Sequence, residues 1–196
     1  MKRIYLAGKI AKNDWRHVIF PGLREIAREQ GQEVAESYNE HRDVTEWDEH
    51  DILSYDGRWT YTGPYFSGCD HGCTHDQKFP GHAVTGGCVY AATRSKDWGH
   101  QTGYRPWVYG QCVRAISRCD IFFAWLDDDT TAYGTLVEIG IARGMGKRVV
   151  IATPPRVDWT STGGIDDMWF ALETASKIIT ASTAVDAFRN LQGELT

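Results

Sequence analysis

The clearest pattern of apolar positions in the chain lies in residues 116–152. Within it, residues 120–126 are an almost unbroken apolar and aromatic run, too short for an ordinary helix and typical of a strand covered on both faces of a parallel sheet. A helix with apolar positions at core-facing spacing follows from Gly134-Thr135 to Gly146, and residues 147–153 form the next buried strand. The three elements predict one βαβ unit.

The remaining pattern predicts the same alternation of strands and helices on both sides of this unit. Further strands are expected at residues 2–8, 33–37 and 177–180, and helices at 15–29, 107–118, 168–172 and 183–191. This order favours a single α/β domain over residues 1–196, of the flavodoxin-like (Rossmann-like) type, with a five-stranded parallel sheet and helices on both faces.

Regular patterning is absent after the expected second strand, over residues 38–105. The segment contains Trp47, Trp59 and Trp98 and many tyrosines, whereas disordered segments are poor in aromatic residues. We therefore expect an ordered insertion over the active site, because so long a connection is usually functional. Its aromatic and histidine side chains, Tyr65 and His71 among them, would suit a wall for a planar base and a sugar.

The same segment carries cysteines and histidines that could bind a metal ion. Cys69, Cys73, His75 and Cys88 are candidate ligands of a structural zinc ion, since thiolate and imidazole are preferred zinc ligands. The C-x3-C spacing has no second matching pair, so a polar, glycine-rich turn is the alternative interpretation.

Charge and hydropathy exclude several classes of protein. The formal net charge is −5 and no basic run is present, so binding to polymeric nucleic acid is not expected. No apolar run approaches the length of a membrane span, and the chain begins directly with a strand, so a cytoplasmic protein without a signal peptide is expected. Five cysteines, an odd number, favour thiols or a metal site over a disulfide framework.

Candidate chemistry is concentrated after the strand at residues 120–126. Asp127, Asp128 and Asp129 end this strand, where ligands bind in parallel α/β sheets. Glu138, in the first turns of the following helix, is the only charged residue between Asp129 and Arg143. Because the helix dipole favours an ionised carboxylate there, Glu138 could be a nucleophile or a base. The alternative is that Glu138 only complements the helix dipole.

Residues 117–120, the later GTLVEIGIARGMGKRVV and the opening IYLAG together resemble the nucleoside 2-deoxyribosyltransferase-like family. The resemblance covers the start of the chain to about residue 35, and Pro106 to the end. It implies that Glu138 is the nucleophile that attacks the anomeric carbon. It also implies that Asp120, which matches an aspartate before the third strand, and Tyr5, which matches the tyrosine of the first strand, are catalytic residues that position the sugar and the nucleophile.

One position departs from the family pattern. The family usually has an aspartate six residues before its glutamate to handle the proton on the base, and this chain has Ala132 there. Asp127, Asp128 or Asp129 is expected to replace it.

The resemblance implies cleavage of the N-glycosidic bond of a nucleoside or nucleoside monophosphate through a covalent glycosyl-Glu intermediate, with transfer to another base or to water. No cofactor is required for this chemistry. A homo-oligomer that shares active-site residues is expected, with a small nucleoside or nucleotide as substrate. Candidate substrate-binding residues outside the insertion are Gly8, Lys9, Arg16, Ser117, Gly134 and Trp169.

Two other functions stay open at this point. Nucleotide phosphoribohydrolases also contain Gly-Thr-x-x-Glu, but their Pro-Gly-Gly run is replaced here by residues 130–133, TTAY. A nucleotide-binding sensor could keep the same pocket without turnover.

Overall fold

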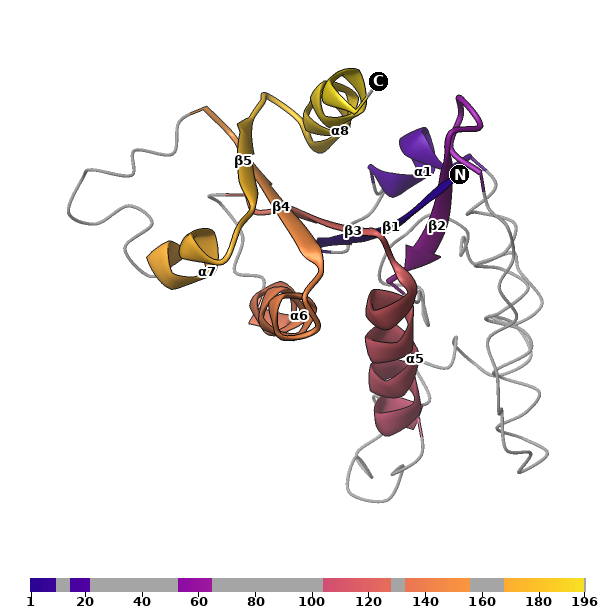
Figure 1. Cartoon of the computed structure of the whole chain (residues 1–196), viewed down its shortest axis with the longest axis vertical. Coiled ribbons are helices and arrows are strands. Elements are labelled where there is room, and N and C mark those ends of the chain that lie inside the picture. Colours follow the sequence, from indigo (N-terminus) through magenta and orange to yellow (C-terminus); the bar gives the residue numbers. More distant parts are fainter. Residues whose placement is uncertain (10–14, 22–52, 65–103, 128–132, 156–167, 196) are drawn as a thin grey trace, which may run out of the picture. The chain divides into compact units, whose positions relative to one another are not determined.

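A computed structural model describes residues 1–9, 15–21, 53–64, 104–127, 133–155 and 168–195, with the backbone alone at residues 104–108. The chain divides into two compact units. Figure 1 labels the helices and strands that the structure describes. The first unit comprises Met1–Lys9, Asp56–Pro64 and Val113–Thr196, and the second comprises Ile10–Tyr55 and Tyr65–Cys112.

The first unit contains a five-stranded sheet in which all neighbouring strands are parallel. Its strands are β1 (Lys2–Gly8), β2 (Trp59–Gly63), β3 (Ile121–Trp125), β4 (Arg148–Thr153) and β5 (Lys177–Thr180). They lie in the order β2-β1-β3-β4-β5. This order, with the crossover after β2, confirms the flavodoxin-like fold predicted from the alternation of elements.

Burial along the strands follows their position in the sheet. All five residues of β3, at the centre, are buried, as are the last five of β1 and of β4. In β5, at one edge, only Ile179 is buried. Central strands of a parallel sheet are covered on both faces, which explains why their sequences are continuous apolar runs without alternation.

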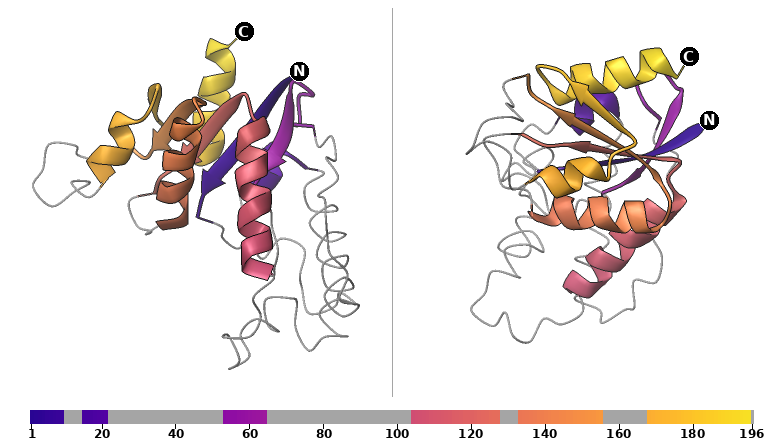
Figure 2. Two further views of the ribbon diagram at one scale, coloured as in Figure 1. Left: turned by 60° about the horizontal axis from the view of Figure 1, so that its bottom comes forward. Right: turned by 60° about the vertical axis from the view of Figure 1, so that its left-hand side comes forward.

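Helices cover the two faces of this sheet. On one face, α6 (Tyr133–Gly144) contacts β1, β3 and β4, and α7 (Trp169–Glu173) packs against α6. On the other face, α8 (Ala184–Glu194) contacts β4 and β5, and its Phe188 ring packs edge to face on Phe123 and Trp59. Figure 2 shows α6 and α8 on opposite sides of the strands. Helix α5 (Tyr104–Arg118) leads into β3.

Helix α8 begins with a side-chain cap. Helix α8 begins at Thr183, whose Oγ1 accepts a hydrogen bond from the Asp186 backbone N–H at 3.1 Å. A threonine in this N-cap position satisfies one of the unpaired amides of the first turn. The helix expected at residues 183–191 is therefore confirmed and runs to Glu194.

The second strand is in a different place from the one expected. The strand that pairs with β1 at the sheet edge is Trp59–Gly63, inside the segment 38–105 interpreted as an insertion. The insertion as drawn from the sequence is therefore wrong at residues 59–63. The strand expected at residues 33–37 lies outside the described residues. β2 was missed because its alternating pattern spans only five residues and lies in a segment rich in glycine and aromatic residues, where no other regular pattern accompanies it.

In the second unit, the structure describes the short helix α1 (Arg16–Ile19) and the start of α5, up to Cys112. Arg16, His17 and Ile19 are buried, and the Arg16 guanidinium lies over the Trp15 ring at 4.6 Å from its centroid. The backbone N–H of Tyr55 donates to the carbonyl of Ile19 at 2.9 Å. The remainder of the helix expected at residues 15–29 falls mostly outside the described residues. In the part of the chain that is described, no helix combines the length and apolar character that crossing a bilayer requires.

Candidate active site

Tyr5 of β1 and Glu138 of α6 meet in the first unit. The Tyr5 hydroxyl donates a hydrogen bond to Glu138 Oε1, with an O···O distance of 2.5 Å. Tyr5 is fully buried and Glu138 is half-buried. An O–H···O distance at this short end is typical of a hydroxyl that donates to an ionised carboxylate, which is a strong type of hydrogen bond.

The periodicity of each element explains why these two side chains meet. In a strand, successive side chains point to opposite faces, so Tyr5 leaves the sheet on the opposite face from Ile4 and Leu6. On α6, Thr135 and Ala142 are buried at the positions three before and four after Glu138. Residues at this spacing share one face of a helix, so Glu138 lies on the side of α6 that faces the sheet. A glutamate that only complemented the helix dipole would have no reason to lie on the side of α6 that faces the sheet.

The Tyr5 ring is held by a neighbouring aromatic side chain. It stacks on Phe122 of β3, with ring centroids 5.3 Å apart and ring planes at 10°. The two residues are partners in the parallel register of β1 and β3. Sequence reasoning did not single out Phe122, because within the apolar run of β3 nothing distinguishes it from Phe123, which faces the opposite side.

The carboxyl ends of β1 and β3 share one edge of the sheet. Gly8, the last residue of β1, is in register with Trp125, the last residue of β3, and Asp127 follows two residues later, half-buried. Gly8 has a φ of 146°, a backbone conformation that glycine adopts far more readily than other residues. Asp128 and Asp129 lie outside the described residues, so the identity of the aspartate that serves the base stays a prediction.

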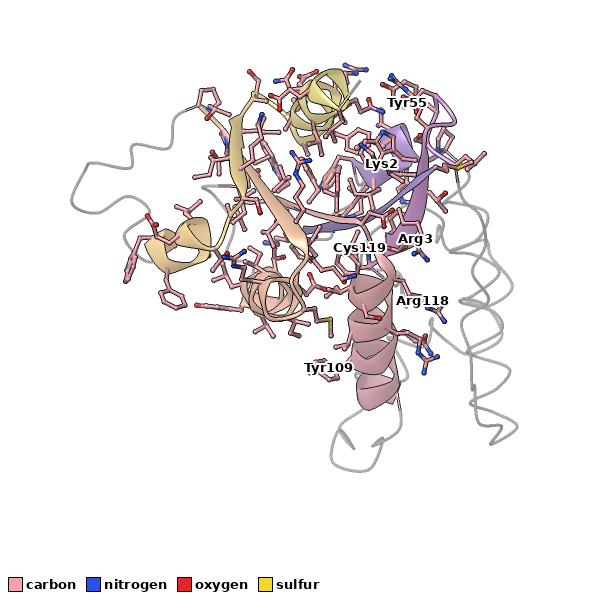
Figure 3. All side chains as sticks on the ribbon, viewed as in Figure 1. Lys2, Arg3, Tyr55, Tyr109, Arg118 and Cys119 are labelled. Carbon is pink, nitrogen blue, oxygen red and sulfur yellow. The ribbon has the colours of Figure 1, made fainter. Side chains whose placement is uncertain are left out.

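Asp120 and Ser117 lie at the other end of β3. The Asp120 carboxylate accepts a hydrogen bond from the Arg3 backbone N–H at 2.7 Å, which ties the start of β3 to the start of β1. Figure 3 labels Arg3 and Cys119, the residue directly before Asp120 in the sequence. The Ser117 hydroxyl donates to the Arg114 carbonyl at 2.7 Å, within α5. Both contacts lie within the fold, and the roles of Asp120 as a catalytic residue and of Ser117 as a substrate-binding residue stay predictions.

The remaining candidates are spread over the two units. Gly134 is exposed in the first turn of α6, and Trp169 is exposed on α7, where its ring packs edge to face on Phe170. Lys9 is exposed directly after β1. Arg16 belongs to the second unit, where it is buried over Trp15. Their roles in substrate binding stay predictions.

The proposed zinc ligands and two wall residues of the insertion fall outside the described residues: Cys69, Cys73, His75, Cys88, Tyr65 and His71. Within the described ranges, no three His, Cys, Asp or Glu side chains are grouped so that they could hold a metal ion.

Cys119, between α5 and β3, is a core residue with an inert thiol. Burial raises the pKa of the Cys119 thiol to about 11, against a smaller lowering by the charge of Lys147. The sulfur donates to the Ile116 carbonyl at 3.2 Å. A thiol with so high a pKa is protonated at neutral pH, so Cys119 is no nucleophile. Cys119 is almost fully buried.

Comparison with known proteins gives one family match. Residues 72–167 match the family described as nucleoside 2-deoxyribosyltransferase. This range contains Asp120, Asp127 and Glu138 but not Tyr5. No curated protein sequence matches the chain.

Solved structures also match the chain, and two of them do so with low sequence identities and TM-scores. One is the CMP N-glycosidase BcmB of Clostridium botulinum, with 19% identity over 47% of this chain and 74% of that chain, and a TM-score of 0.35. The other is a conserved protein from Enterococcus faecalis V583, with 14% identity over 99% of both chains and a TM-score of 0.37.

Proposed function

We infer, from the premise that the chain belongs to the nucleoside 2-deoxyribosyltransferase-like family, that it is an enzyme that breaks the N-glycosidic bond of a small nucleoside or nucleoside 5′-monophosphate. We propose further that Glu138 is the nucleophile and that the reaction passes through a covalent glycosyl-Glu138 ester. The sugar is then transferred to a second base or to water.

The observation that carries this proposal is the 2.5 Å hydrogen bond from the Tyr5 hydroxyl to Glu138 Oε1. A partly buried carboxylate aligned by a fixed donor is prepared for attack, because it needs little reorganisation before it reacts. Tyr5 is fixed by burial and by stacking on Phe122, so the direction of its hydroxyl is set by the sheet. In this way β1 and β3 orient a side chain on α6.

The first step forms a bond between one Glu138 oxygen and the anomeric carbon of the sugar and breaks the bond from that carbon to the base nitrogen. The base leaves with the bonding electrons and takes a proton from one of Asp127, Asp128 and Asp129. This is the double-displacement scheme of retaining glycosidases, with a heterocycle in place of an alcohol.

The second step breaks the ester. Water or a new base attacks the anomeric carbon, the acceptor's proton passes to the same aspartate, and Glu138 departs as a carboxylate. Negative charge returns to Glu138 in this step, and a hydrogen bond from Tyr5 stabilises that charge as it develops. Tyr5 therefore both orients Glu138 for attack and stabilises it as the leaving group of the second step. Neither step requires a metal ion or a cofactor.

The test begins with the wild-type protein and a panel of ribo- and deoxyribonucleosides and their 5′-monophosphates, with free base and free sugar followed by chromatography. Base exchange marks transfer and free sugar marks hydrolysis. Glu138→Gln keeps the size of the side chain and should reduce turnover to background, because an amide is a far weaker nucleophile than a carboxylate.

Glu194→Gln is the matched control, since Glu194 is exposed on α8, on the opposite face of the sheet, in a surface ion pair with Lys177. It should retain full activity. Acid-quenched wild-type enzyme should carry the mass of one sugar on a peptide that contains Glu138. Turnover by Glu138→Gln at the wild-type rate, or a sugar on another residue, would refute the nucleophile.

A further inference from the structure

We propose that Gly63 of β2 is a positioning residue for this reaction: because it has no side chain, the Tyr5 ring fits beside it and directs its hydroxyl at Glu138. This inference rests on the proposed function, in which Tyr5 and Glu138 act together.

Gly63 and Tyr5 are partners in the register of β2 and β1, where the register shifts between Ile4 and Tyr5. A Cβ atom on Gly63 would lie 2.5 Å from Cε2 and 2.8 Å from Cδ2 of Tyr5, and 3.0 Å from the Cβ of Ala115 on α5. Such Cβ contacts below 3.0 Å are essentially never seen in real structures. If residue 63 had a side chain, the Tyr5 ring could not keep its observed position.

The Tyr5 ring has little room to move away. Tyr5 belongs to β1, which lies between β2 and β3 in the sheet. The Phe122 ring of β3 stacks against the Tyr5 ring, with their centroids 5.3 Å apart. Tyr5 is also fully buried, in an interior that is close-packed. Cε2 is bonded to the ring carbon that carries the hydroxyl, so a push on Cε2 displaces the hydroxyl from Glu138.

The end of β2 is held as well. The Tyr61 hydroxyl donates to the Pro64 carbonyl at 2.6 Å, a buried hydrogen bond that spans Gly63. The backbone of Gly63 does not lie in the left-handed region, unlike that of Gly57. The reason for glycine at this position is therefore the space beside Tyr5 and not a left-handed φ.

The experiment compares Gly63→Ala with Gly193→Ala, the same change in α8, where an added Cβ meets no atom within 4 Å. On the active substrate, Gly63→Ala should lower kcat by about 10- to 100-fold, the usual effect of a small displacement in an active site. Gly193→Ala should leave kcat unchanged. In a Tyr5→Phe background, Gly63→Ala should cause little further loss, because its effect passes through the Tyr5 hydroxyl. Full activity of Gly63→Ala, or a loss that is independent of Tyr5, would overturn the inference.

A second measurement does not depend on activity. In protein labelled with tyrosine ¹³C at Cζ, the resonance that disappears in Tyr5→Phe belongs to Tyr5. The Tyr5 resonance should shift in Glu138→Gln, because an amide oxygen accepts the hydrogen bond from Tyr5 less strongly than a carboxylate does. It should also shift in Gly63→Ala but not in Gly193→Ala. If the wild type turns over no nucleoside while Gly63→Ala still shifts the Tyr5 resonance, the proposed function fails and the positioning of Tyr5 stands. An unshifted Tyr5 resonance in Gly63→Ala refutes the positioning.

Gly63→Ala could also yield insoluble protein. Adding Phe122→Leu removes the ring against which Tyr5 stacks, so the double variant should fold with the Tyr5 resonance displaced. A folding defect of Gly63→Ala that Phe122→Leu fails to relieve would overturn the inference, because the collision with Tyr5 would then not be its cause.

Discussion

Tyr5 and Phe122, partners on adjacent strands, stack with their ring planes at 10° and their centroids 5.3 Å apart. The pair joins the core to the candidate site, because the same tyrosine donates to Glu138. The packing of β3 therefore affects the chemistry on α6.

Phe122→Leu tests this connection. We expect the free energy of unfolding to fall by about 1 kcal/mol, through the loss of buried area and of the stacked pair. Activity should fall several-fold, because the Tyr5 ring gains freedom. Chemical denaturation and steady-state kinetics measure the two effects. Phe123→Leu, on the face toward α8, is the control: it should be destabilised as well and keep its activity, and an equal loss of activity there would argue against a specific role of Phe122.

Tyr5→Phe removes one oxygen atom and leaves the stacked ring in place. We expect kcat to fall by about 100-fold, a typical cost of removing one hydrogen-bond donor that stabilises developing charge. Because the donor assists the departure of Glu138, the glycosyl-enzyme should accumulate in this variant during turnover. Mass spectrometry of acid-quenched samples measures its fraction, and an unchanged kcat would exclude a catalytic role for the hydroxyl.

Lys147 holds the C-terminal end of α5 at the start of β3. Its Nζ donates to the carbonyls of Ser117 at 2.5 Å and Cys119 at 3.0 Å. Lysine in this place satisfies carbonyl groups that the helix leaves unpaired. Lys147→Met keeps the length of the side chain and should lower the free energy of unfolding by about 1–2 kcal/mol, as seen by urea denaturation.

Steady-state kinetics distinguish the structural role of Lys147 from a role in catalysis. Below its unfolding transition, Lys147→Met should retain the wild-type kcat, since the contacts of Lys147 lie at the amino end of β3. A large loss of activity in a folded Lys147→Met would place Lys147 in the site and contradict a purely structural role.

Cys119 predicts a dependence of stability on alkaline pH. Burial raises the pKa of its thiol from 9.0 to about 11, so between these values the unfolded chain releases this proton and the folded chain retains it. The contribution of the thiol is fully present below pH 9 and is lost as the pH rises through 11, by about 3 kcal/mol in total.

Urea unfolding at pH 8 and pH 10.5 measures this loss. In Cys119→Ala the decrease between the two pH values should be smaller by about 2 kcal/mol, whatever the cost of the substitution at pH 8. An identical decrease in both proteins would show that the thiol titrates alike in the folded and unfolded chains.

Most of the sheet could be predicted from the sequence. The strands at residues 2–8 and 177–180 coincide with β1 and β5, and the βαβ unit around Glu138 is present with its ends shifted by one or two residues. These elements have strong local signals, either continuous apolar runs or helical spacing with recognisable ends. Glu138 was also evident locally, as the lone charge on an apolar helix.

The sequence by itself therefore determined the type of sheet, the helix that carries Glu138 and the family resemblance. Only the tertiary structure decided that Trp59–Gly63 is the strand beside β1, that Tyr5 reaches Glu138 across 133 residues of chain, and that Gly63 leaves room for the Tyr5 ring. The physical reason is that local pattern records whether a residue is buried, while the direction of a side chain and the space beside it depend on which strands become neighbours.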